Sequence, residues 1–179
     1  IYDSVVGSLQ IMSNKETNLN HFYPEKEERL NVLSHWYGFL CSAICFPFLI
    51  VKSVSTGDPI YIFSLTIFGI TLMLMFITST MYHQSINPKE RNRYRILDMF
   101  AIYTMIAGSY TPYALVLLQG QRGWILFGLI WSIALLGILW KSFTFGKYNI
   151  SSTFLYVAMG AICLFYTKDL IQLLDYNGL

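Results

Sequence analysis

Long runs of apolar residues divide this chain into segments that contain no charged side chain. Five stretches lack Asp, Glu, Lys and Arg altogether: 30–51, 59–88, 99–121, 123–140 and 148–167. A helix needs about 20 mostly apolar residues to cross the ~30 Å hydrocarbon core of a bilayer. The stretches show neither the 3.6-residue periodicity of an amphipathic helix nor the two-residue alternation of a barrel strand. The pattern predicts an all-α, polytopic membrane bundle with helices near 36–52, 60–82, 98–118, 123–141 and 151–168.

The composition excludes the main classes of soluble protein. Of the 179 residues, 55% are hydrophobic and only 12% are charged, whereas about a quarter of the residues in a soluble domain are charged. The net charge of +2 and the three cysteines argue against a disordered chain, a disulfide scaffold and a nucleic-acid-binding domain. We therefore expect membrane lipids as partners and no nucleic acid.

The basic residues predict which ends of the helices face the cytoplasm. Cytoplasmic loops retain Lys and Arg. A cytoplasmic N-terminus puts nine of the 12 basic residues on that side: Lys15, Lys26, Arg29, Lys89, Arg91, Arg93, Arg95, Lys141 and Lys147. We interpret the cluster at 88–95 as a loop attracted to anionic headgroups, with about 1 kcal/mol from each charge. Residues 1–24 are predicted to be a polar tail ahead of a membrane domain at 25–179.

Polar side chains mark the entry to the first predicted helix. Glu28, Asn31 and His35 fall within about 60° of one another at 100° per residue on a helix. Such a polar stripe either faces the protein interior, where it orders neighbouring side chains, or lies among the headgroups. The sequence leaves both possibilities open.

A second polar group lies where the second predicted helix ends and the third begins. Ser79 and His83 are one helical turn apart, and Asp98 opens the next helix across the basic loop. Antiparallel neighbours joined by a short loop bring these ends together. The imidazole and the carboxylate then either contribute to a zinc site or form a structural pair, with Asp98 at a helix N-terminus.

Small residues and one proline predict how the helices pack. Gly108, Gly128, Gly137 and Gly160 are expected to permit close helix contacts. Pro112 is expected to free backbone carbonyls and kink the third helix.

Together these blocks resemble the signature motifs of the hemolysin III family, the bacterial branch of the progestin and adipoQ receptor family. The resemblance runs from about Tyr23 to Leu179. It is carried by Glu28-x-x-Asn31-x-x-x-His35, Ser79-x-x-x-His83, Leu97-Asp98 and Gly108-Ser109-Tyr110-Thr111-Pro112.

The resemblance implies a seven-helix protein of the plasma membrane with a cytoplasmic N-terminus and a zinc ion near the cytoplasmic side. The wider superfamily includes alkaline ceramidases, so the implied chemistry is hydrolysis of a lipid amide. On this interpretation His83 is a zinc ligand, Asp98 holds the water that zinc activates, and Ser79 supports the site as an oxyanion donor. Glu28, Asn31 and His35 match the first block and are assigned structural support.

The family's third block, a His-x-x-x-His pair on the seventh helix, supplies the other two zinc ligands and is absent from this chain. We expect 177–179 to be an interhelical turn of a truncated sequence. A His-x-x-x-His pair is expected about 60 residues after Leu179, because two more helices of ~20 residues and their loops would intervene. Five of seven helices are then present, and the chain alone should bind zinc poorly and lack hydrolase activity.

Two other hypotheses remain open. The hemolysin label suggests a membrane-perturbing or pore-forming protein, although the continuously apolar helices offer no amphipathic face to line a channel. The other hypothesis is a non-catalytic membrane protein in which His83 and Asp98 form a structural pair. The sequence does not determine the oligomeric state.

Overall fold

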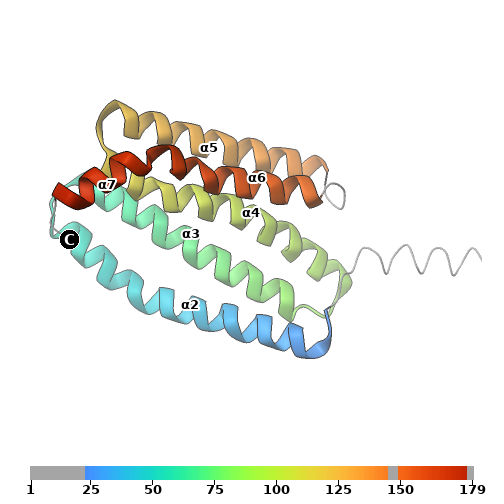
Figure 1. Cartoon of the computed structure of the whole chain (residues 1–179). Helices are drawn as coiled ribbons and strands as arrows, with labels where there is room; N and C mark the ends of the chain where they lie inside the picture. Colours follow the sequence, from blue (N-terminus) through green and yellow to red (C-terminus); the bar gives the residue numbers. More distant parts are fainter. Residues whose placement is uncertain (1–22, 145–148, 177–179) are drawn as a thin grey trace, which may run out of the picture.

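The computed structural model describes residues 23–144 and 149–176, and all the regular secondary structure in these ranges is helical. The elements, in chain order, are α2 (Glu25–Val54), α3 (Pro59–Gln84), α4 (Pro88–Pro112), the π-helical η1 (Tyr113–Leu118), α5 (Gly120–Phe143), α6 (Asn149–Ala161), the 3₁₀ segment η2 (Ile162–Tyr166) and α7 (Thr167–Tyr176). In Figure 1, α2, α3 and α4 lie side by side in sequence order, and α5 and α6 pack together against α4.

Five helical spans in the described ranges are long and apolar enough to cross a membrane: Glu25–Val54, Pro59–Gln84, Pro88–Leu118, Gly120–Phe143 and Ile150–Asp169. Large apolar side chains point outward from these spans, among them Phe48, Leu136 and Phe154. Contact of such an apolar surface with lipid chains is favourable, whereas its contact with water is unfavourable. The structure therefore confirms the predicted all-α membrane bundle.

Two helices begin well before their predicted starts. α2 begins at Glu25 and α4 at Pro88, whereas the charge pattern predicted 36 and 98. Freedom from charge marks the part of a helix that can lie in hydrocarbon, but backbone hydrogen bonding continues into charged segments that reach water. The predicted basic loop at 88–95 is therefore the first two turns of α4. Residues 1–22 of the tail predicted at 1–24 lie outside the described residues, as does the predicted turn at 177–179.

The connections between the first three helices are short and capped. The Asp58 side chain accepts a hydrogen bond of 2.8 Å from the Ile60 amide, and Asn87 accepts one of 3.0 Å from Lys89. In both cases a proline follows the cap, where its fixed φ suits the first helical residue and its missing N–H costs nothing. These caps and prolines start α3 and α4 after short connections, so that consecutive helices lie antiparallel to each other.

The buried core lies where α4, α5 and α6 meet. Tyr103, Leu126, Ile130 and Met159 have almost no exposed surface and form one cluster. The Tyr110 hydroxyl donates to the carbonyls of Met159 and Gly160 at 2.9 Å each, which ties α4 to α6. The α-helical pattern of this span changes to a π-helix directly after Pro112, as expected where proline removes a backbone donor.

Two of the four glycines permit close helix contacts as predicted, and two do not. A Cβ at Gly108 would lie 2.0 Å from Thr71 Oγ1, and one at Gly137 would lie 2.4 Å from the Tyr103 ring. A Cβ at Gly128 or Gly160 would have no neighbour within 4 Å, so the prediction is wrong for these two. In the described structure both face open space.

This difference predicts opposite effects of the same substitution. Gly108→Ala should lower the free energy of unfolding by about 1–3 kcal/mol, because the new methyl group overlaps Thr71 in a packed contact. Gly128→Ala should leave stability unchanged or raise it by up to about 1 kcal/mol, because alanine favours the helix. Unfolding of the two variants in mixed micelles by an anionic detergent measures both, and equal stabilities would contradict the α3–α4 contact.

Candidate site at one end of the bundle

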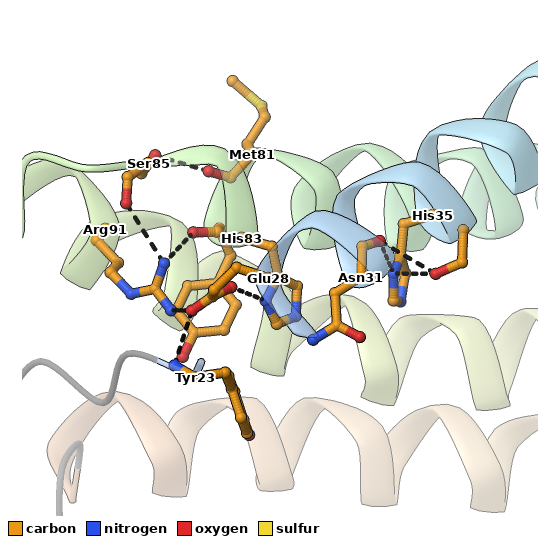
Figure 2. A network of polar contacts seen from close by, with 10 residues as sticks. Tyr23, Glu28, Asn31, His35, Met81, His83, Ser85 and Arg91 are labelled. Atoms are coloured by element: carbon orange, nitrogen blue, oxygen red, sulfur yellow. Dashed lines mark hydrogen bonds and ion pairs between the residues drawn. The ribbon is translucent and has the colours of Figure 1, made fainter. Parts of the chain in front are cut away.

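The polar groups of three helices meet at the end of the bundle where α2 and α4 begin and α3 ends. The Glu28 carboxylate lies between two partners there, as Figure 2 shows. Its Oε2 is 2.7 Å from Nδ1 of His83, and its Oε1 accepts a hydrogen bond from Nη2 of Arg91. The exposed fractions of the three side chains are 14% for Glu28, 10% for His83 and 3% for Arg91. One carboxylate therefore joins α2, α3 and α4.

Arg91 holds this junction together from inside the protein. Its Nη1 donates to the backbone carbonyls of Tyr82 at 3.1 Å and Ser85 at 3.4 Å. Its guanidinium also lies over the Tyr82 ring, 4.5 Å from the centroid. A guanidinium presents its donors in a rigid planar fork, which suits simultaneous contacts to a carboxylate and two carbonyls.

Arg91 lies in the segment 88–95 that was predicted to be a basic loop. That prediction is wrong for this residue, which is a buried residue of α4. The signal was present in the sequence: Asn87 followed by Pro88 is a helix start, and it extends α4 backward. With the helix extended, Arg91, Arg95 and Asp98 follow one another at spacings of four and three and so share a face.

The contact with Glu28 orients the His83 ring. A neutral imidazole that donates from Nδ1 keeps its lone pair on Nε2, and a carboxylate on one ring nitrogen commonly orients a histidine whose other nitrogen binds a metal. Glu28 Oε1 also accepts a 3.0 Å hydrogen bond from the Tyr23 backbone amide. Contacts with Tyr23 and Arg91 at Oε1 and with His83 at Oε2 therefore fix the position of this carboxylate.

His35 lies beside the His83 imidazole and contacts the main chain of Asn31. The His35 ring stacks near the His83 ring, with centroids 5.8 Å apart and an interplanar angle of 29°. His35 Nδ1 lies 2.7 Å from the Asn31 backbone oxygen, so the contact between these two residues involves the asparagine main chain. Of the first sequence block, Glu28 and His35 thus lie beside His83, as a face turned toward the protein interior requires.

Ser79 and Asp98 form the other side of the site. The Ser79 hydroxyl, the His83 ring and the His35 ring all lie near enough to the Asp98 carboxylate to interact with it electrostatically. The Ser79 side chain is 5% exposed, and Asp98 is half-buried. The structure therefore brings Ser79, His83 and Asp98 together across α3 and α4. Asp98 lies within α4 and not at its start, so the predicted interaction with the helix N-terminus is wrong.

The site fits zinc in the kind of its ligands but not in their number. An imidazole oriented by a carboxylate, with a second carboxylate nearby, is a donor set that zinc binds. Within residues 23–144 and 149–176, however, no three His, Cys, Asp or Glu side chains are arranged to hold one ion. The described residues thus provide one well-oriented nitrogen of such a site.

The sequence matches a known family over most of its length. Residues 23–178 match the family model described as "Haemolysin-III related". The chain belongs to the hemolysin III family. It is 34% identical over 167 residues to Hemolysin-3 of Bacillus cereus, a match that covers 93% of this chain and 75% of the relative. It is 37% identical over 153 residues to a Hemolysin-3 homolog of Bacillus subtilis (strain 168), with 86% and 72% covered.

No solved structure matches this hemolysin III chain significantly. The family membership and the five spans together make it a hemolysin III-related integral membrane protein.

The buried junction predicts that two arginines on the same helix behave differently. Arg91→Met should lower the free energy of unfolding by about 3–5 kcal/mol, because it leaves the Glu28 carboxylate without its cation at a shielded site. Arg93→Met, at an exposed position two residues along, should change it by less than about 0.5 kcal/mol. Detergent unfolding in mixed micelles provides the measurement.

A double substitution tests the cause of that loss. Adding Glu28→Gln to Arg91→Met should recover part of the stability, because the unpaired charge is then removed. Losses that simply add would show that the two side chains do not interact.

Proposed function

We propose that this hemolysin III protein hydrolyses an amide bond of a membrane lipid, with His83 as one ligand of a zinc ion whose other ligands lie outside the described residues. The observation that carries the proposal is the contact between Glu28 and Nδ1 of His83, beside the Ser79–Asp98 pair. An oriented imidazole next to a half-buried carboxylate is an arrangement that metal-assisted hydrolysis uses. When bound, zinc would polarise the carbonyl group and lower the pKa of water.

The two carboxylates have different partners and therefore different tasks. Glu28 is engaged by Arg91 and by Nδ1 of His83, so it fixes the tautomer and angle of the imidazole. Asp98 lies near Ser79 and the two histidines, and its two oxygens carry lone pairs that can accept a proton. In the proposed reaction Asp98 orients the attacking water and accepts its proton.

Ser79 lies near the Asp98 carboxylate, and its hydroxyl group has one proton to donate. The oxyanion role that the family resemblance implied uses this proton for the reacting carbonyl, whereas a positioning role uses it for Asp98. We propose positioning of Asp98 as its resting role.

We also propose that the site faces the cytoplasmic leaflet, on the basis of the distribution of Lys and Arg. A cysteine introduced at Thr56, in the α2–α3 connection, should then react with a membrane-impermeant thiol reagent added to intact cells. One introduced at Ile86, in the α3–α4 connection, should react only after the cells are opened. Both variants are made in a background without the natural cysteines, and the reverse labelling would overturn the orientation.

The zinc proposal predicts different losses at two neighbouring positions of α3. The complete purified protein should contain stoichiometric zinc and release fatty acid from a lipid amide in nanodiscs. His83→Ala should lose the metal and at least about 100-fold in rate. Gln84→Ala, at the exposed next position, should keep both. Glu28→Gln should weaken zinc binding about 10–100-fold, as expected when the partner that orients a ligand is removed.

Stoichiometric zinc retained in His83→Ala would overturn this assignment. Leakage of dye from liposomes that persists in His83→Ala and after removal of zinc would instead favour membrane perturbation, the activity that the relatives' name suggests.

A further inference from the structure

A cavity of about 350 Å³ opens beside Asp98 at the same end of the bundle. It lies between the start of α4 and the start of α6, and its wall is completed by Tyr23, two residues before α2, and by Tyr82 near the end of α3. The other lining residues include Arg95, Asp98, Ile102 and Ser152. Because Asp98 belongs to both, the cavity adjoins the candidate site.

The α4 wall of this cavity changes from charged to apolar along the helix. Arg95 lies nearest the helix start, Asp98 follows one turn later, and Ile102 lies one turn beyond that. At 1.5 Å per residue the change takes about 10 Å. A lipid lying along this wall would have its headgroup beside Arg95, its first carbonyl group beside Asp98 and its chains directed toward the hydrocarbon core.

The outer part of the cavity favours an anion rich in oxygen. Arg95 presents a guanidinium group, whose planar fork of donors matches a phosphate. Lys141 is fully buried and lies close enough to Arg95 for the two charges to repel each other. An anion beside Arg95 is attracted by both positive charges, and the hydroxyl group of Ser152 on the opposite wall is a further donor.

We propose that this cavity binds a phosphate-bearing headgroup, and that Arg95 makes the protein select lipids that carry one. The identity of the reaction rests on the proposed function above, whereas the binding preference rests on the cavity alone. The volume of the cavity far exceeds that of one phosphate group, and its apolar inner wall makes no favourable contact with a free ion. A lipid is therefore the occupant to which the geometry points.

The test compares two lipid amides that differ only in the headgroup, one a phosphomonoester and the other its neutral hydroxyl counterpart. The complete protein is placed in phosphatidylcholine nanodiscs with EDTA, so that binding is measured without turnover. The native protein should bind the phosphate-bearing lipid at least tenfold more tightly than the neutral one. Arg95→Gln should reduce that ratio to about one, and Arg93→Gln, at the exposed position on the same helix, should leave it unchanged.

Three outcomes would overturn the proposal. Equal affinity of the native protein for both lipids would do so, and so would an identical loss of preference in Arg93→Gln. Saturable binding of inorganic phosphate that depends on Arg95, without any preference between the lipids, would show an ion site and not a headgroup site. If Arg95→Gln does not fold, the test uses Arg95→Lys and Ser152→Ala. A headgroup preference that is retained in Arg95→Lys and weakened in Ser152→Ala supports the proposal. A preference that is lost in Arg95→Lys or unchanged in Ser152→Ala overturns it.

Activity measurements separate this proposal from the previous one. With zinc present, a clear headgroup preference in binding but no hydrolysis would overturn the proposed reaction and leave the headgroup site in place. Equal hydrolysis of both lipids with equal KM would leave the reaction in place and overturn the headgroup site.

Discussion

The Glu28 carboxylate, shared between Arg91 and His83, is the interaction on which the described end of the bundle depends. Among the described elements, α2 packs closely along α3 alone. Its direct tie to α4 is the ion pair between Glu28 and Arg91. A charge in a shielded, partly apolar setting is costly unless it is paired and hydrogen-bonded. Glu28 meets that condition only when all three helices are in register.

The same interaction determines what His83 can do. Removing water from an ion pair costs more than the attraction returns unless the geometry is good, so such a network is weak evidence for stability alone. It does, however, hold an imidazole at one angle with one nitrogen facing Glu28. Sites built on helices and supported by a second layer of contacts are the ones that keep a reactive geometry.

The bilayer explains why these groups are concentrated at one end. Charged side chains deep in hydrocarbon are expensive, and the core between α4, α5 and α6 is packed mainly with apolar groups such as Leu126 and Ile130. The end of the bundle lies where lipid headgroups meet water, and charged side chains can be used there. The site and the neighbouring cavity beside Arg95 both lie at this end of the bundle.

The sequence alone determined the approximate spans, among them a second helix near 60–82 that begins at Pro59 in the structure, and the placement of Ser79 and His83 one helical turn apart. These features depend on local hydrophobicity, on a cap followed by proline and on a spacing of one turn, all of which can be read over a few residues. The backward extension of α4 from 98 to Pro88 had a local signal as well, in Asn87 and Pro88. The charge pattern concealed it, because charges near a membrane surface are compatible with either a loop or a helix.

Only the tertiary structure decided that Arg91 turns inward while Arg93 stays exposed. Both are arginines of one basic segment, and nothing in their identity distinguishes them. Their difference comes from the rotation of α4 against α2 and α3, which places one guanidinium beside Glu28 and leaves the other outside. Likewise, Gly108 and Gly128 are both glycines of predicted spans, but only Gly108 faces a neighbouring helix. A sequence specifies which groups are available, whereas the packing of helices far apart in the chain specifies which groups meet.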